Sequence, residues 1–135
     1  MALLEKLGKF KDLGLLIIRL GVGLSFALIH GLPKMLGGPS GWEKIGGAMG
    51  YVGIHFLPMF WGFMASATEA VGGIFIVLGL FFRPACIFMA FTMLVASLMM
   101  ISKEGFGDAS HAIEVGFVFL GLLFIGPGKY SVDRK

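Results

Sequence analysis

The chain alternates between long apolar runs and short stretches rich in glycine or charge. A helix needs roughly 20 mostly apolar residues to cross the hydrocarbon core of a bilayer. Four runs reach or approach that length, at about residues 13–32, 58–82, 84–101 and 110–126. The pattern therefore predicts an all-α protein, an integral membrane four-helix bundle.

Residues that begin or end helices stand at the borders of these runs. Arg83 and Pro84 separate the second run from the third, and proline is tolerated in a first helical turn because its missing N–H has no partner there. GPGK at residues 126–129 ends the fourth run, since proline cannot continue a helix. We expect a very tight turn between the second and third helices.

The connection between the first two predicted helices, residues 33–57, is too regular for an ordinary loop. Large apolar residues recur there at spacings of three and four, which places them on one face of a helix. They are Trp42, Ile45, Met49, Val52 and Phe56. Four glycines interleave with them: Gly46, Gly47, Gly50 and Gly53. Glycine weakens an isolated helix, so we predict a glycine-rich interfacial or re-entrant segment between helices 1 and 2.

Composition supports the membrane class. Hydrophobic residues make up 57% of the 135 residues, charged residues only 14%, and the mean hydropathy is +0.91. A soluble domain usually carries about 25% charged residues. The length suits one transmembrane domain over residues 1–135. A cleaved secretory signal is the competing interpretation of the first run, but Arg19 interrupts the run and no A-x-A site follows, so we expect it in the mature protein.

Lysine and arginine placement predicts the orientation. Seven basic residues lie on one side of the predicted spans: Lys6, Lys9, Lys11, Arg83, Lys129, Arg134 and Lys135. Three lie on the other side: Lys34, Lys44 and Lys103. Because positive residues accumulate on the cytoplasmic side of a membrane, we predict that both termini are cytoplasmic.

Ionisable residues lie inside the predicted spans or near their ends. Arg19, Glu69 and Glu114 fall within spans, and His30 and His111 fall near span ends. An arginine or aspartate at the centre of a membrane helix costs about 2.5–3.5 kcal/mol, so each such charge needs a partner. Arg19 and Glu69 have compatible depths, and we predict that Glu69 neutralises Arg19. The pair is either functional or serves only to fix the helix register.

A candidate polar pocket lies near the outer membrane face, among the first, second and fourth helices. His30 and Lys34 close the first helix, while His111 and Glu114, three residues apart, share one face at the start of the fourth. The competing interpretation is that the histidines only pack and that Lys34 extends to the interface. The third helix carries methionines and no charge, so we expect it to face lipid or pack in the core.

Several chemistries have no support in the sequence. Cys86 is the one cysteine, which excludes an intrachain disulfide and dithiol chemistry of the C-x-x-C kind, and we expect it to pack as a small apolar residue. The three histidines lack spacings typical of a metal or haem site, so no metal is predicted. The net charge of +3 comes from scattered residues, which gives no indication of nucleic acid binding. No cofactor motif is evident.

Three stretches together resemble the DoxX family of small bacterial four-helix membrane proteins: RLGVGLSFALIHGLPKMLGG, TEAVGGIFIVLGLFFRPA and IEVGFVFLGLLFIGPGKYSVD. The resemblance runs from about residue 13 to residue 133. Matched by position, the polar part of the family pattern falls on Arg19, His30, Lys34, Glu69 and Glu114. The structural part falls on Gly31, Gly72, Gly73, Gly126, Pro127, Gly128, Tyr130 and Ser131.

This family is named after a subunit associated with thiosulfate:quinone oxidoreductase, and other members are linked to membrane complexes that handle thiol and oxidative stress. The resemblance implies a redox-associated subunit of the bacterial inner membrane, with a quinone as candidate ligand and soluble redox proteins as candidate partners. Arg19, His30 and Lys34 would donate hydrogen bonds to the ligand, and Glu69 and Glu114 would tune charge or relay protons.

Two other functions remain open. In a transporter or channel for a small solute, the polar residues would form a path, but four helices without an internal repeat are few for alternating access unless the chain forms a homo-oligomer. In a structural scaffold for soluble partners, the charges would serve assembly only. The chain has no self-sufficient catalytic motif, so the residues leave open whether it is an enzyme. The lipid bilayer is the partner that the sequence indicates directly.

Overall fold

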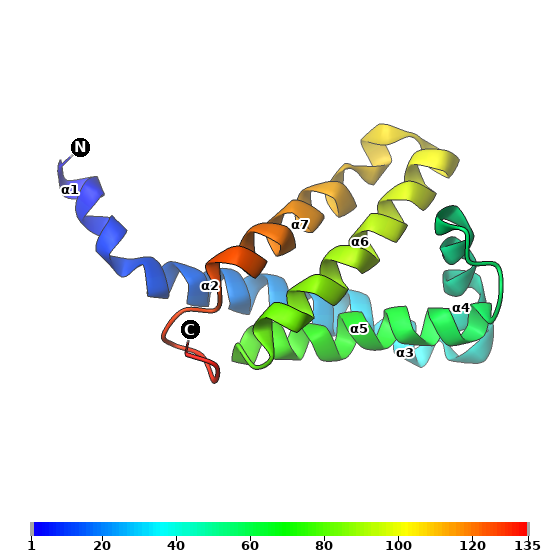
Figure 1. Ribbon diagram of the computed structural model, residues 1–135, viewed down its shortest axis with the longest axis horizontal. Coiled ribbons are helices and arrows are strands. Elements are labelled where there is room, and N and C mark those ends of the chain that lie inside the picture. Colours follow the sequence, from blue (N-terminus) through cyan, green and yellow to red (C-terminus); the bar gives the residue numbers. More distant parts are fainter. Residues whose placement is uncertain (1, 135) are drawn as a thin grey trace.

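The computed structural model describes residues 2–134, which form helices joined by short turns (Figure 1). Lys135, one of the seven basic residues counted for the orientation, lies outside the described residues, as does Met1. Within residues 2–134, four helices are long and apolar enough to cross a membrane: Ala2–Leu36, Pro58–Leu78, Phe82–Glu104 and Phe106–Ile125. The predicted all-α membrane bundle is therefore confirmed.

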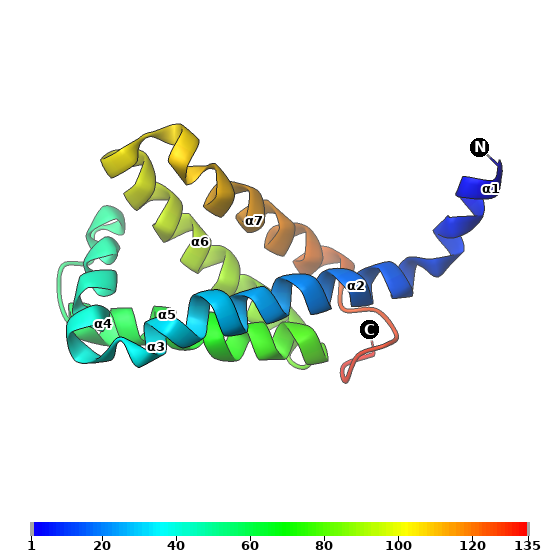
Figure 2. The same ribbon diagram turned by 180° about the vertical axis from the view of Figure 1, so that it is seen from behind.

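The first long helix is built from five consecutive pieces. They are α1 (Ala2–Glu5), the 3-10 helix η1 (Lys6–Phe10), α2 (Lys11–Leu24), the π-helix η2 (Ser25–Gly31) and α3 (Leu32–Leu36). The predicted span 13–32 was too short at both ends, because the helix continues into polar residues that an apolar run does not include. The α1–η1 segment projects from the body of the molecule (Figures 1 and 2).

The other three spanning helices are α5 (Pro58–Leu78), α6 (Phe82–Glu104) and α7 (Phe106–Ile125). The turn between α5 and α6 comes earlier than the sequence predicted, because Gly79 has a φ of +66° and Phe81 a φ of +46°. Such left-handed values end a helix, and glycine adopts them at little cost. Pro84 accordingly lies inside the first turn of α6 rather than at its first residue.

The glycine-rich segment folds as two short helices, α4 (Gly38–Gly46) and the 3-10 helix η3 (Gly47–Val52). An added Cβ at Gly46 would collide with the carbonyl of Pro58, and one at Gly62 would collide with the carbonyl of Trp42. The missing side chains therefore let α4 lie directly against α5. The glycines that would weaken an isolated helix are what allow this one to pack.

The spanning helices form two pairs. The α2–η2 segment packs on α5, and α6 packs on α7. From the α5–α6 turn the two pairs diverge, and the α4–η3 segment lies where they are far apart (Figures 1 and 2). We call the end of the molecule that holds the α5–α6 turn, the start of α2 and the segment after α7 the terminal end, and the opposite end the α4 end.

Small residues join α2–η2 to α5. An added Cβ at Gly73 would lie 2.7 Å from the nitrogen of Ala27 and from the carbonyl oxygen of Gly23. In a bilayer the apolar effect does not favour helix contact over lipid contact, so close backbone approach matters more than it does in water. A separate core of buried side chains, which includes Phe26, Met89 and Phe119, fills the space between the pairs near the terminal end.

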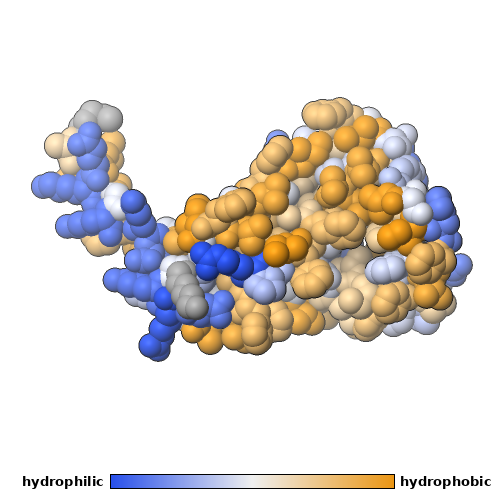
Figure 3. Space-filling view, viewed as in Figure 1, coloured by the Kyte–Doolittle hydropathy of each residue, from blue (hydrophilic) through white to orange (hydrophobic). Residues whose placement is uncertain are grey.

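The surface between the two ends is apolar. Figure 3 shows a broad hydrophobic area over the body, with hydrophilic residues on the N-terminal arm, at the C-terminal segment and at the α4 end. Phe124 on α7 is 80% exposed, and many other large apolar side chains are exposed to a smaller extent. Such a surface suits contact with lipid tails rather than with water.

Candidate functional site

Glu69 lies in the middle of α5 on the buried side of that helix. The residue is 3% exposed, and Ser66, Gly72 and Gly73 are buried on the same helix. The Ser66 hydroxyl donates to the carbonyl of Gly62 at 2.8 Å, so this group is satisfied within α5. A buried carboxylate needs a cation or several donors, and the partner of Glu69 must come from another element.

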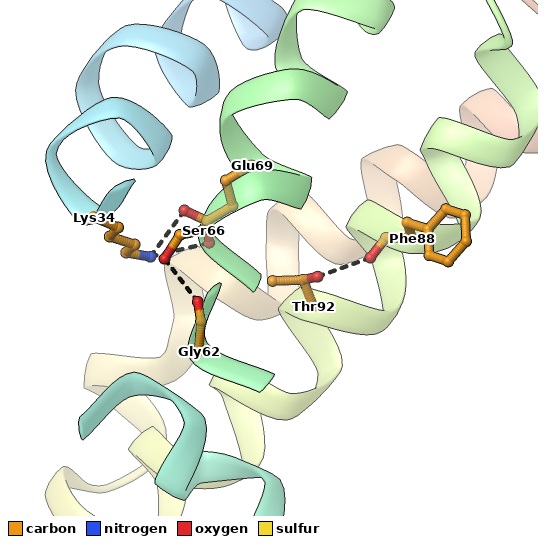
Figure 4. A network of polar contacts seen from close by, with 6 residues as sticks. All are labelled: Lys34, Gly62, Ser66, Glu69, Phe88 and Thr92. Atoms are coloured by element: carbon orange, nitrogen blue, oxygen red, sulfur yellow. Dashed lines mark hydrogen bonds and ion pairs between the residues drawn. The ribbon is translucent and has the colours of Figure 1, made fainter. Parts of the chain in front are cut away.

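Lys34 of α3 supplies that partner. Its Nζ donates to Oε1 and Oε2 of Glu69 at 3.0 and 2.9 Å, and the two side chains point toward each other in Figure 4. The Lys34 side chain is 39% exposed, so the carboxylate is the buried member of the pair. Gly31 permits this approach, because an added Cβ there would collide with the backbone of Ala70, beside Glu69.

The predicted pair between Arg19 and Glu69 is wrong. Arg19 is 1% exposed, and its guanidinium donates to four backbone carbonyls, those of Ile76 (3.2 Å), Val77 (3.0 Å), Pro127 (2.8 Å) and Tyr130 (2.8 Å). The last carbonyls of a helix have no intrahelical donor and carry the negative end of the helix dipole. Arg19 therefore meets the end of α5, about 10 Å along the helix from Glu69 at a rise of 1.5 Å per residue.

Gly126, Pro127 and Gly128 shape the segment that Arg19 holds. Gly126 and Gly128 have φ values of +89° and +84°, and the carbonyl of Pro127 accepts from Arg19 Nη1. Two residues after Pro127, the backbone N–H of Lys129 donates to Oδ1 of Asp12 at 3.0 Å. The arginine thus fastens α2, α5 and the segment after α7 to one another at the terminal end.

A cavity of about 410 Å³ opens beside Glu69, between the α4–η3 segment, α5 and α6. Ligand pockets usually measure about 300–1,000 Å³. Apolar side chains from α5 and α6, among them Met64, Phe88 and Phe91, form much of its wall. Phe88 and Thr92 of α6 lie in the same close view as the Lys34–Glu69 pair (Figure 4). The cavity therefore combines an apolar wall with charged groups.

Three lysines line this cavity: Lys34, Lys44 and Lys103. They are the three that the sequence placed on the side with fewer basic residues. Lys34 is neutralised by Glu69, whereas no ion pair within residues 2–134 involves Lys44 or Lys103. The charged residues that line the cavity therefore sum to a positive charge, which favours a ligand with electron-rich oxygen atoms.

Trp61 adds a donor that has no acceptor. Its Nε1 is buried and has no hydrogen-bond partner within the described part of the chain. The indole of Trp42, by contrast, donates to the carbonyl of Lys34 at 3.2 Å. Leaving a buried N–H unsatisfied costs about 1–3 kcal/mol. Trp61 also lines the cavity, but this nitrogen has almost no exposed surface, so the residue offers its ring rather than its N–H to the cavity.

His30 and His111 come together away from this cavity. Their ring centroids lie 5.9 Å apart with 29° between the ring planes, and Phe26 packs on His30 at 5.0 Å. His111 and Glu114 are exposed on α7. Within residues 2–134, no group of three or more His, Cys, Asp or Glu is arranged to hold a metal ion. Of the six predicted polar residues, the cavity brings together Lys34 and Glu69.

Lys44, Lys103 and Trp61 were missed by the sequence interpretation. The two lysines lie outside the predicted spans, so the cost of an intramembrane charge did not single them out. Their placement on one membrane side with Lys34 was the signal that could have grouped them. The third helix was expected to face lipid or the core, and Met89 and Met93 are indeed buried. The same helix also forms one wall of the cavity, which its lack of internal charge had hidden.

Comparisons with known proteins agree with this architecture. The DoxX family model matches residues 14–102, which include every residue that lines the cavity except Lys103, one position beyond the match. The inner membrane protein YphA of Escherichia coli strain K12 is 33% identical over 137 residues, covering 95% of this chain and 94% of YphA. The uncharacterized membrane protein Rv3486 of Mycobacterium tuberculosis is 30% identical over 138 residues, covering 87% and 78% of the two chains. No solved structure matches this chain significantly.

Proposed function

The chain belongs to the DoxX family and is a multi-pass protein of the bacterial inner membrane, and from its cavity we propose that it is a redox-associated subunit that binds a quinone. The single observation that carries the proposal is the lining of the cavity, where apolar walls meet three lysines. A quinone head has the matching chemistry, since it is an apolar ring with carbonyl oxygens at opposite edges.

The positive charge of the site supports a redox role in particular. Lysine ammonium groups donate to a neutral carbonyl, and they bind an oxygen that has gained negative charge more strongly. Reduction of a quinone puts negative charge on those oxygens, so a site with Lys44 and Lys103 at its mouth stabilises the reduced form relative to the oxidised one. Glu69 holds Lys34 in place and limits the total charge. Soluble redox proteins, as the family resemblance implies, are the proposed electron source.

Arg19 has no part in the proposed binding site. Its guanidinium donates to backbone carbonyls at the terminal end. His30 and His111 lie outside the cavity lining as well. The proposal therefore assigns ligand contact to Lys34, Lys44, Lys103 and Trp61, and leaves to Arg19 the stabilisation of the helix ends.

Tryptophan fluorescence offers a direct test, because Trp42 and Trp61 are the two tryptophans of the chain. In a Trp42→Phe background, Trp61 is the sole reporter, and a quinone bound in the cavity quenches it. The probe is ubiquinone-0, which has the quinone head and no hydrocarbon tail, titrated into protein purified in detergent. We expect saturable quenching, with a Kd raised about tenfold by Lys103→Gln or Lys44→Gln through loss of one charged donor.

Two controls make the test specific. Lys6→Gln removes an exposed lysine from the N-terminal arm and should leave the Kd unchanged. His30→Ala separates the cavity from the histidine pair, and it too should leave the Kd unchanged. Absence of saturable quenching in the parent protein, or equal Kd values in the cavity lysine variants, would overturn the quinone proposal and favour the scaffold interpretation.

A further inference from the structure

A second hollow lies along the outer side of α5 and α6. It has a volume of about 430 Å³ and extends to the α5–α6 turn, where Phe81 and Pro84 border it. Thr68 contributes the one polar side chain among the residues that line it, and no charged residue does so. We call this hollow the α5–α6 groove. Its chemistry fits hydrocarbon and nothing more polar.

The groove adjoins the cavity. Met64, Thr68 and Phe88 line both hollows, so the two share a border at the level of Glu69, the residue after Thr68. Charged groups lie on one side of this border, toward the α4 end, and apolar ones on the other, toward the terminal end. The two hollows thus lie next to each other, the cavity with charged residues in its lining and the groove without them.

Small side chains keep the groove open. Ala67 and Gly72 of α5 face it from one side, and Ala85 of α6 faces it from the other. At Gly72 an added Cβ would lie 3.2 Å from Sδ of Met89, so the two helices touch at the base of the groove there. Larger residues on the outer face of α5, at Ala67 or Val71, would fill the groove without disturbing that contact.

From this adjacency we propose that the ligand is an amphiphile with a hydrocarbon tail, whose head lies in the cavity and whose tail lies in the α5–α6 groove and crosses between them beside Thr68. The inference rests on the proposed function for the head and adds the class of molecule to it. The groove is open to the lipid side, so the ligand enters sideways from the bilayer and passes Thr68 with its tail still in hydrocarbon. Tail contacts with the groove then fix the orientation of the head toward Lys34 and Trp61.

The test compares two probes that share a head, ubiquinone-0 and decylubiquinone, on variants that fill the groove. Val71→Trp places a large ring in the groove, and Val118→Trp is the matched control. Both valines are partly exposed on spanning helices, 46% and 40%, and Val118 lines neither hollow. We expect Val71→Trp to raise the Kd of decylubiquinone about tenfold while the Kd of ubiquinone-0 changes less than about twofold. Val118→Trp should change neither. Because each new tryptophan also fluoresces, binding is measured here by equilibrium dialysis.

A second variant keeps the test decisive if Val71→Trp does not fold. Ala67→Phe fills the same groove from a half-buried position and should show the same selective loss. Equal Kd values for decylubiquinone in the parent and both groove variants would overturn the inference and leave the groove to bilayer lipid. Binding of ubiquinone-0 that persists in that case would leave the proposed function intact, whereas failure of both probes on the parent protein would remove the proposed function as well.

Discussion

At the scale of single residues, the two buried charges in the described part of the chain have partners of different kinds. Glu69 forms an ion pair with the side chain of Lys34 at 2.9 Å. Arg19 donates hydrogen bonds to backbone carbonyls at the end of α5 and after α7. A guanidinium has five donors in a rigid fork and can serve several carbonyls at once, which an ammonium cannot do as well. The choice of residue type at each position follows from the partner that is available there.

The Lys34–Glu69 pair should be asymmetric under mutation. Lys34→Met leaves a carboxylate that is 3% exposed without its cation, and it should destabilise the protein by about 3–5 kcal/mol, the range for breaking a buried pair. Glu69→Gln should cost less, because the Lys34 side chain is 39% exposed and can extend to water. Thermal unfolding in detergent measures both.

A double-mutant cycle then identifies the partner. Lys34→Met combined with Glu69→Gln should be milder than the sum of the single changes, by about 0.5–3 kcal/mol. The comparison cycle of Arg19→Lys with Glu69→Gln should be additive, because these side chains do not meet. Coupling in the second cycle and additivity in the first would contradict the observed pairing.

Arg19→Lys should destabilise the protein although it keeps the charge. Lysine cannot reach all four carbonyls, and each buried carbonyl left without a donor costs about 1–3 kcal/mol. Arg83→Lys is the control, since Arg83 is exposed and donates through Nε to one carbonyl, that of Leu123 at 3.0 Å. The control should change stability by less than about 0.5 kcal/mol. Similar melting temperatures for the two variants would show that Arg19 acts only as a point charge.

The candidate site could be predicted from the sequence only in part, for a physical reason. The cost of a charge inside a span singled out Arg19 and Glu69 from position alone, and both are buried. Their partners could not be assigned the same way, because the backbone carbonyls left unpaired at a helix end have no signature in the sequence of side chains. Lys44 and Lys103 lie outside the spans and acquire a role only when the α4–η3 segment folds back onto α5 and α6.

At the scale of elements, apolar runs located the spanning helices well and their ends less well. The run ends where polar residues begin, but a helix ends where its backbone hydrogen bonding ends. The first helix therefore extends to Ala2, beyond the run, while α5 stops at Leu78, within it. Gly79 ends α5 because its backbone is left-handed. A glycine within an apolar run does not by itself indicate that the helix ends there.

The C-terminal segment supports the start of α6. Both carboxylate oxygens of Asp133 accept bonds from the first amides of that helix, from Phe81 N at 3.2 Å and from Phe82 N at 2.8 Å. Helix N-terminal amides lack intrahelical acceptors, and a carboxylate also favours the positive end of the helix dipole. A residue far along the chain thus performs the function that a preceding serine or aspartate usually performs.

Asp133→Ala should therefore lower stability by about 0.5–2 kcal/mol, the usual cost of losing a cap. Asp108→Ala is the matched control, because Asp108 is an exposed acidic residue in the first turn of α7, a helix without a side-chain cap bond. The control should cost a smaller amount. Thermal unfolding of the two variants in the same detergent decides the matter, and equal losses would show that only the helix dipole is involved.

At the scale of the whole molecule, the two helix pairs join at one end and separate toward the other, and this divergence makes room for the cavity. The terminal end is tied by Arg19, Asp12 and Asp133, and the pairs share a buried core there. At the α4 end the pairs are bridged by a glycine-rich segment that packs on both. The contacts that tie the terminal end thus lie away from the proposed binding site, so mutations of Arg19 or Asp133 should lower stability without altering binding, whereas Lys34 contributes to both.

The start of α2 and the segment after α7 lie at the terminal end, and the distribution of basic residues predicts that this end is cytoplasmic. The contacts of Asp12 with Lys129 and of Arg19 with Pro127 require the start of α2 and the end of α7 to be on the same side.

Reporter fusions test the compartment: one at the C-terminus should report the cytoplasm, and one inserted at Gly105, between α6 and α7, should report the periplasm. Changing Lys6, Lys9 and Lys11 together to glutamine should weaken this orientation, because it removes the basic residues ahead of the first span. Identical compartments for the two fusions would contradict the four-span arrangement. Opposite compartments in the reverse sense would keep the fold and place the cavity on the cytoplasmic side, where soluble redox partners would meet it directly.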